Sequence, residues 1–189
     1  MSIETSTKIG LLSKALILCG ETPLTSLSDN RYGATVGSNL FEILYESELQ
    51  SHPWRFSMKK AALSRLNVTP LNQYSYVHQI PADCLLVRHI YPTTNYEIFG
   101  DRIYSDETTV ELDYQFKPEV SEIPAHFALL LTYALARDMV KPLTESDGAV
   151  KLLAAKYQMQ RDRSMYADAQ ARPAVAVQYS PFVAARQGG

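Results

Sequence analysis

Hydrophobic residues change their spacing twice along this chain, and this pattern constrains the fold more than any other feature. They recur every three or four positions in residues 5–19 and 29–50, which is the spacing of amphipathic helices. Residues 54–116 alternate between apolar and polar, as half-buried strands do, and residues 124–170 return to the helical spacing. The sequence therefore predicts an α+β protein with a β-sheet inserted between two pairs of helices.

These periods divide the chain into three parts. We expect residues 1–52 and 124–171 to form a four-helix bundle, with two helices from each end of the sequence. Residues 53–123 are predicted to form one antiparallel sheet of about five strands, in which Gly100-Asp101 makes a tight hairpin. Residues 172–189 are predicted to be an extended C-terminal arm.

Glycine and proline mark the bounds of the first two helices. Gly20 supplies a C-terminal stop, since glycine enters the left-handed conformation without penalty. His52-Pro53-Trp54 ends the second helix, and a strand is expected to begin directly at its tryptophan. Gly33 and Gly37 lie on the opening turns of the second helix. They either let another backbone approach closely or fray the helix end, and the second interpretation is favoured.

Residues that start or end a helix also flank the last two helices. Pro124 opens the third helix at the position where proline is tolerated, and Lys141-Pro142 is expected to close it. Thr144, with Asp147 three residues later, resembles a capping box for the fourth helix. Residues 158–163 are mostly polar, so the second half of that helix is expected to leave the core and project outward.

The predicted arm is more apolar than a solvating tail needs to be. Isolated, residues 172–189 would be a flexible tail. We favour an arm that docks on a neighbouring subunit, because extended segments can add a strand or fill a groove on a partner. The candidate contact residues are Val175, Val177, Tyr179 and Phe182.

Composition and motifs exclude several classes of protein. The net charge of −2 lacks the basic footprint of a general nucleic-acid coat. No phosphate-binding glycine loop, metal-ligand motif or nucleophile motif is present, so we expect no enzyme activity, no cofactor and no metal site. No apolar run approaches the roughly 20 residues of a membrane span, and no signal-peptide pattern follows Met1. Cys19 and Cys84 are interpreted as buried thiols in a reducing compartment.

Two groups of residues still deserve weighing as chemical sites. His78 and His89 are expected on adjacent strands, but two histidines without a third ligand make a poor metal site. A cluster of acids could supply a carboxylate pair for glycoside hydrolysis or for a divalent cation, and catalysis there is the less favoured interpretation. These acids are Asp101, Asp106, Glu107, Glu111 and Asp113.

Charge is divided unevenly along the predicted sheet. Residues 51–95 hold five basic and one acidic side chains, whereas residues 96–123 hold two basic and eight acidic ones. Solvated surface charge explains any single residue. Taken together, a basic flank and an acidic flank on one sheet suit subunits that meet side by side in a ring.

The order of motifs resembles the tail tubular protein A family of tailed bacteriophages, also described as head-to-tail adaptors or gatekeeper-type connectors. The resemblance covers about residues 5–170. It is carried by five segments in series, namely Gly20-Glu21-Thr22-Pro23-Leu24-Thr25-Ser26-Leu27, His52-Pro53-Trp54-Arg55-Phe56, Lys59-Lys60-Ala61-Ala62-Leu63, Ile80-Pro81-Ala82-Asp83-Cys84-Leu85 and Pro142-Leu143-Thr144-Glu145-Ser146. The C-terminal arm has no place in this pattern.

The resemblance implies a structural virion protein of the tail or neck, made in the host cytoplasm. Family members form a ring, typically of twelve copies, between the portal protein and the tail nozzle, and genomic DNA passes through the lumen. No membrane is involved. It also implies that Trp54 packs in the core at the corner from helix to sheet, and that Asp83 shapes a turn between strands.

Two other functions are kept as alternatives. One is a tail-associated polysaccharide or cell-wall hydrolase that uses the acids of the sheet. The other is a DNA-binding regulator whose first two helices form a helix-turn-helix. The regulator is disfavoured because residues 1–50 hold six acidic and three basic side chains, whereas a recognition helix needs basic contacts to phosphate.

Overall fold

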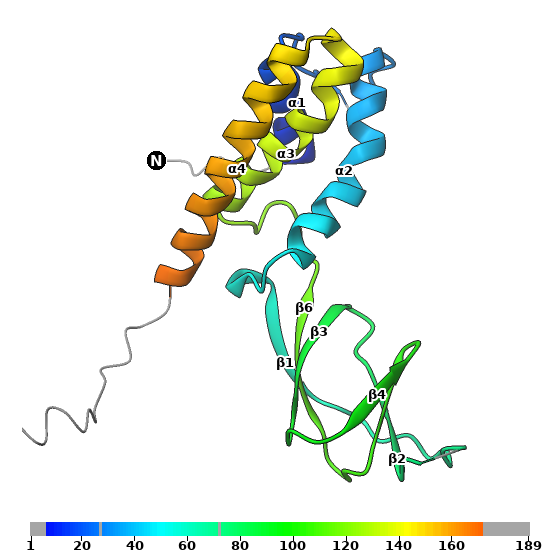
Figure 1. Ribbon diagram of the computed structural model, residues 1–189. Coiled ribbons are helices and arrows are strands. Elements are labelled where there is room, and N and C mark those ends of the chain that lie inside the picture. The colour runs from blue at the N-terminus through cyan, green and yellow to red at the C-terminus, as the bar shows by residue number, and fades with distance from the viewer. Residues whose placement is uncertain (1–6, 27, 72, 172–189) are drawn as a thin grey trace, which may run out of the picture.

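The computed structural model of the chain describes residues 7–26, 28–71 and 73–171, and these form four helices and two small antiparallel sheets (Figure 1). The helices are α1 (Lys8–Leu18), α2 (Tyr32–Gln50), α3 (Ala125–Thr144) and α4 (Asp147–Gln170). The strands are β1 (Met58–Ala62), β2 (Tyr76–Gln79), β3 (Cys84–Tyr91), β4 (Tyr96–Phe99), β5 (Arg102–Ser105) and β6 (Glu111–Phe116). The predicted α+β class is confirmed.

Helix α3 is the centre of the helical layer and packs against α1, α2 and α4. Its apolar stripe is fully buried, as the spacing predicts, and Gly20 ends the α1 segment with a φ of 86°. The favoured interpretation of the α2 glycines is wrong. A Cβ on Gly37 would lie 2.9 Å from Leu12 and 3.0 Å from Met139, so this glycine lets side chains of α1 and α3 reach the backbone of α2.

The strands form two sheets of three, so the prediction of one sheet of about five strands is wrong. The sheet orders are β1-β6-β3 and β2-β5-β4. The chain leaves the first sheet directly after β1 and joins the second, because the Leu66 amide donates to Val77 (2.8 Å) and the Gln79 amide donates to Ser64 (3.0 Å). Alternation predicts the two faces of a strand but not which strand pairs with it, so the division into two sheets could not be predicted from the sequence.

The predicted strand at Trp54 is also wrong, because residues Arg55–Ser57 form a single 3-10 turn and β1 starts at Met58. The turn is held from both sides. The Ser57 amide and hydroxyl donate to the Trp54 carbonyl at 3.0 and 2.9 Å, and the Arg55 amide donates to Oδ1 of Asp168 at 3.0 Å. The carboxylate on α4 therefore overrides the local alternation. Trp54 itself is fully buried, as predicted.

The junction between α3 and α4 differs from the prediction in two details. Pro142 does not close α3 but lies inside its last turn, and the helix continues to Thr144 and is capped by Glu145, which has a φ of 54°. The cap of α4 is Ser146, whose hydroxyl accepts from the Ala149 amide at 3.3 Å, and not Thr144. The Thr144 hydroxyl instead donates to the Val140 carbonyl within α3.

The helical layer meets the first sheet at a narrow connection centred on Gln115 of β6. Its side chain is fully buried, and its amide nitrogen lies 2.8–2.9 Å from the carbonyls of Leu49 and His52 and from the Ser57 hydroxyl. The Gln115 carbonyl oxygen accepts from the Arg88 guanidinium on β3. We call this group the neck; it connects the end of α2 to the sheet by hydrogen bonds that water cannot replace.

Replacing Gln115 tests the neck. We expect Gln115→Leu to lower the free energy of unfolding by about 2–4 kcal/mol, because it leaves buried carbonyls without a donor and the Arg88 guanidinium without its acceptor. Urea denaturation of the two proteins measures this loss. The control Gln73→Leu, at an exposed position, should change stability by less than about 0.5 kcal/mol. Equal stability of Gln115→Leu and the unaltered chain would contradict the role of the neck.

Candidate interaction surfaces

The four candidate contact residues of the arm, Val175, Val177, Tyr179 and Phe182, lie outside the described residues. Their role stays a prediction. The described part of the chain nevertheless presents surfaces that bear on interaction, and it also places the residues that were weighed as chemical sites.

Three of the five acids of the sheet make separate structural bonds, while Glu111 is exposed and Glu107 takes part through its backbone carbonyl. The Asp101 carboxylate accepts from the side-chain amide of Gln79 at 3.0 Å, and this bond holds the pKa of Asp101 below its usual range. Asp106 accepts from the backbone and hydroxyl of Ser75 on a loop before β2, and Asp113 pairs with Lys60 at 3.3 Å. These three acids therefore have a structural role, because their bonds hold loops and strands together. The hydrolase hypothesis gains no supporting geometry from them.

The histidines do not share a site. His78 on β2 is fully buried, with Nε2 2.9 Å from the Glu107 carbonyl, whereas His89 is exposed on β3 in the other sheet. The expectation of adjacent strands is therefore wrong. Within residues 7–26, 28–71 and 73–171, no three side chains of the metal-binding types lie together. No helix in that same part of the chain is long and apolar enough to cross a membrane.

Asp83 and Trp54 lie where the resemblance implies. Asp83 follows the turn after β2, and its carboxylate accepts from Lys59 (2.8 Å) and from the Tyr114 hydroxyl (3.0 Å), which ties the turn to the first sheet. Trp54 donates from Nε1 to the Glu48 carbonyl at 2.8 Å and packs edge-on against Phe127. Both side chains are engaged in structural contacts, so neither is a candidate for a catalytic role.

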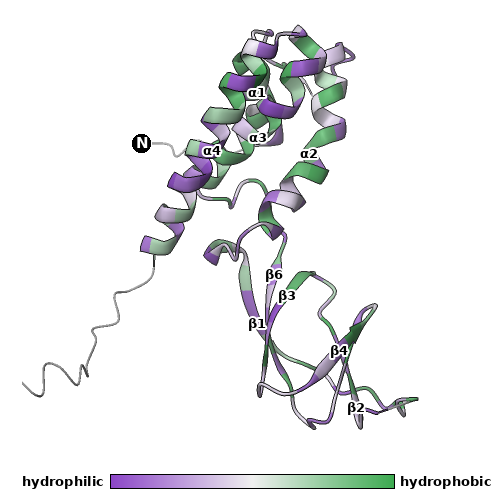
Figure 2. Cartoon of the chain, viewed as in Figure 1, coloured by the Kyte–Doolittle hydropathy of each residue, from purple (hydrophilic) through white to green (hydrophobic). Residues whose placement is uncertain are grey.

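Helix α4 buries a polar face, which contradicts the prediction that its second half leaves the core. Figure 2 shows that this half is largely hydrophilic, yet Gln160, Ser164 and Asp168 are all buried. Ser164 donates to the His126 carbonyl at 2.9 Å, and Gln160 donates to the same oxygen at 3.3 Å. These bonds join α4 to the first turn of α3, and Asp168 continues the row to Arg55 in the neck.

The exposed side of α4 carries a line of three large apolar residues among polar ones. Leu152, Met159 and Tyr166 are 55%, 50% and 68% exposed. Their spacing of seven residues puts all three on one line along the helix, about 21 Å long at 1.5 Å per residue. We call this line the α4 stripe. A helix that buries polar residues and exposes large apolar ones has the composition of an interface rather than of a free surface.

A second apolar patch lies on the other flank of the helical layer. Tyr32 and Ile43 on α2 are about two-thirds exposed, and three helical turns separate them, so they share a face. We call them the α2 patch. In Figure 1, α2 and α4 stand on opposite sides of α3, which packs against both. The patch and the stripe are therefore different surfaces, on helices that lie on opposite sides of α3.

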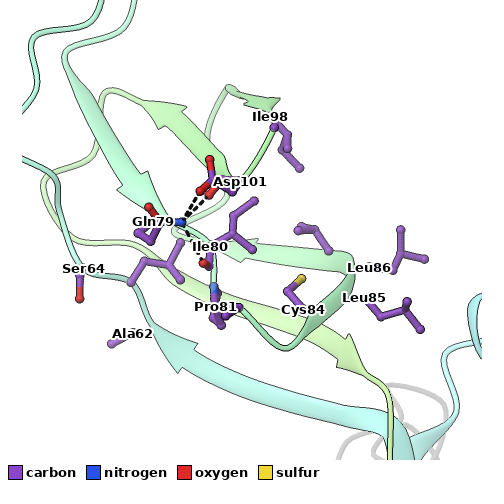
Figure 3. A pocket seen from close by; sticks show the side chains of 14 residues that line it. Ala62, Ser64, Gln79, Ile80, Pro81, Cys84, Leu85, Leu86, Ile98 and Asp101 are labelled. Atoms are coloured by element: carbon purple, nitrogen blue, oxygen red, sulfur yellow. Dashed lines mark hydrogen bonds between the residues drawn. The ribbon is translucent and has the colours of Figure 1, made fainter.

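A pocket of about 840 Å³ opens between the two sheets (Figure 3). Cys84 and Leu86 of β3 lie on one side and Ile98 of β4 on the other, while Ile80 lines its floor. Gln79 and Asp101 close one end through the hydrogen bond drawn there. The lining is mostly apolar, so the pocket suits side chains of a partner better than a charged ligand. We call it the β3–β4 pocket.

A basic hollow of about 740 Å³ lies beside the neck, where the end of α4 approaches the first sheet. Lys59, Lys60 and Arg55 contribute its positive charge, and the buried carboxylate of Asp168 lies at its base. Asp113 also lines the hollow and pairs with Lys60, so basic and acidic side chains of the first sheet meet there within one chain.

The comparisons with known proteins add no relative. The sequence matches no protein-family model, and no curated protein is significantly similar to it.

Sequence reasoning missed the two helix surfaces and the pocket. The seven-residue spacing of Leu152, Met159 and Tyr166 is visible in the sequence and was a usable signal. It was masked because the polar residues between them suggested a solvated helix end, although one of these, Gln160, is buried against α3 together with Ser164.

The two thiols should differ in reactivity. Burial raises the pKa of Cys19 to about 11, and its thiol is enclosed beside the Ala136 carbonyl, whereas Cys84 is partly exposed at the β3–β4 pocket. We expect a disulfide reagent at pH 8 to modify Cys84 at least tenfold faster than Cys19, because attack needs an accessible thiolate. Cys84→Ser should remove the fast phase and Cys19→Ser should not. The reverse result would show that the pocket is closed.

The histidine beneath α4 should make stability depend on pH. Burial lowers the pKa of His126 below its usual 6.5, and its Nε2 is enclosed without a partner. The unfolded chain therefore takes up a proton first as the pH falls, and stability is lost from pH 7.5 to 5.5. Because the ring is partly exposed, His126→Phe should remove only roughly 0.3–0.5 kcal/mol of that loss. Denaturation at both pH values measures the difference, and an unchanged slope would refute it.

Proposed function

We propose that this chain is a structural subunit of a ring that joins a phage portal to its tail. The helices act as a bundle whose flanks pack against neighbouring copies, and the ring forms part of the channel through which genomic DNA passes. The resemblance of motifs suggests about twelve copies and contacts with the portal and the tail nozzle. The proposal makes the chain a virion component without a reaction centre.

The observation that carries the proposal is the pair of apolar surfaces on opposite flanks of the helical layer. A cyclic ring needs a head-to-tail contact between two different surfaces, and twelve copies require a turn of about 30° per copy. The α4 stripe and the α2 patch are two such surfaces, and their lengths are similar, at about 21 and 16 Å. In the ring, the stripe of one copy packs against the patch of the next.

The charge distribution supports the same arrangement. Lys60 pairs with Asp113 within one chain. Glu97 and Asp101, by contrast, belong to the β4–β5 hairpin of the second sheet, apart from the basic hollow at Lys59 and Lys60. Unlike charges across a contact add register and specificity. A net charge of −2 also suits a channel for DNA, because a strongly basic lumen would hold the duplex through its phosphates.

Electron microscopy of negatively stained mixtures tests the ring. The chain is mixed with the portal protein encoded in the same genome, and we expect rings of about twelve subunits at the narrow end of the portal. Met159→Glu should lower the fraction of portals with a ring at least tenfold, since it puts a charge in the centre of an apolar contact.

The matched control is Lys151→Glu, which places the same acidic side chain on the same helix at an exposed position beside the stripe and changes the net charge by −2, against −1 for Met159→Glu. It should leave ring formation unchanged, and circular dichroism should show equal helix content in all three proteins. The proposal fails if the unaltered chain gives no rings, or if Met159→Glu assembles as well as Lys151→Glu.

A further inference from the structure

The two sheets are joined along one side and open along the other. Backbone bonds of residues 63–66 link the end of β1 to β2, which closes that side. On the opposite side, β3 pairs with β6 alone and β4 pairs with β5 alone among the described strands. Residues 84–87 of β3 and Ile98 of β4 line the β3–β4 pocket together with residues 62–64 from the joined side. Neither β3 nor β4 has a second partner strand within the described part of the chain.

The open edge differs from the edge of β1 in its side chains, although β4 is short and β3 is bulged, which also limits pairing. The edge of β1 carries Lys59 and Lys60, and lysines of this kind discourage pairing with another chain. By contrast β4 exposes Ile98 (42%) and Phe99 (57%), and its hydrophobic end is visible in Figure 2. A short apolar edge beside an apolar pocket is the arrangement in which an added strand binds, with backbone bonds for affinity and the pocket for side chains.

The arm has the sequence that such a site requires. Val175, Val177 and Tyr179 alternate with Ala and Gln, so a strand formed by them would have one large apolar face and one small face. Residues 172–189 carry two basic and no acidic side chains, whereas residues 96–123, which include β4, hold eight acids and two bases. Fully extended, residues 172–180 reach roughly 30 Å from the end of α4.

The place where α4 ends favours the arm of another copy over the chain's own arm. Asp168 and Ala169 border the basic hollow, together with His89 and Asp113 on the outer face of the first sheet. Their neighbours along the strands, such as Leu112, are buried between the sheets, because successive side chains point to opposite faces. The arm thus starts on the face of the sheet that is turned away from the pocket.

We propose that residues 174–180 of one copy add as a strand to the open β3–β4 edge of a neighbouring copy, with their larger side chains in the β3–β4 pocket. This contact extends the proposed ring function and rests on it, because the ring is what supplies a neighbouring copy. Each copy then gives one arm and receives one, which links adjacent subunits at the sheet as well as at the helices and protects an exposed edge.

Disulfide trapping tests the contact, because Cys84 already lies on the wall of the pocket. Val175→Cys, Val177→Cys and Tyr179→Cys are made singly in the full chain and oxidised with diamide, which takes up the two hydrogen atoms of the thiols. A disulfide forms only when the two Cα atoms come within about 7 Å. We expect chains joined into dimers and longer ladders on a non-reducing gel, both free at high concentration and on the portal.

The matched controls are Ala174→Cys, Ala176→Cys and Gln178→Cys, which face the opposite side of the same strand. At least one odd-numbered variant should join chains ten or more times faster than its even-numbered neighbours, and Cys84→Ser should abolish the product. Equal rates at odd and even positions, links within single chains only, or no links in either state would overturn the proposal. Rings on the portal without these links would refute the arm contact and leave the ring intact.

Discussion

The side-chain amide of Gln115 connects the helical layer to the first sheet. The helices pack on one another around α3, and the strands enclose a second apolar cluster of their own. Between them, a single buried side chain lies within hydrogen-bond distance of the end of α2 and of the 3-10 turn, and it accepts from Arg88 of β3. Buried polar bonds have strict geometry, so they set the direction in which the sheets leave the helices.

Helix α4 explains how this junction is supported from the other side. Its inward residues are polar because they meet backbone groups, namely the His126 carbonyl at the start of α3 and the Arg55 amide in the neck. Apolar side chains could not satisfy those groups. Large apolar residues nevertheless lie on both sides of α4: Leu153 is buried in the helical core, whereas Leu152, Met159 and Tyr166 are exposed.

The proposals on assembly rest on surfaces that a single copy leaves incomplete. The α4 stripe, the α2 patch and the open edge of β4 each expose apolar side chains, and each is a different kind of surface. A ring would cover the first two by helix packing and the third by strand addition, and the uneven charge of the sheet would set the register. Separate mutations on helix and arm distinguish these contacts, since they lie on different elements.

The sequence by itself determined the element types: the four helices, the α1 stop at Gly20 and the hairpin at Gly100 follow from local spacing and backbone preference, which neighbouring residues decide. Only the tertiary structure decided that the strands split into two sheets, that Arg55–Ser57 turns instead of extending, and that α4 buries its polar face. Each of these depends on partners far apart in the chain, such as Arg55 and Asp168, which are 113 residues apart. No local pattern records such a pair, because its energy arises only when the fold brings the two groups together.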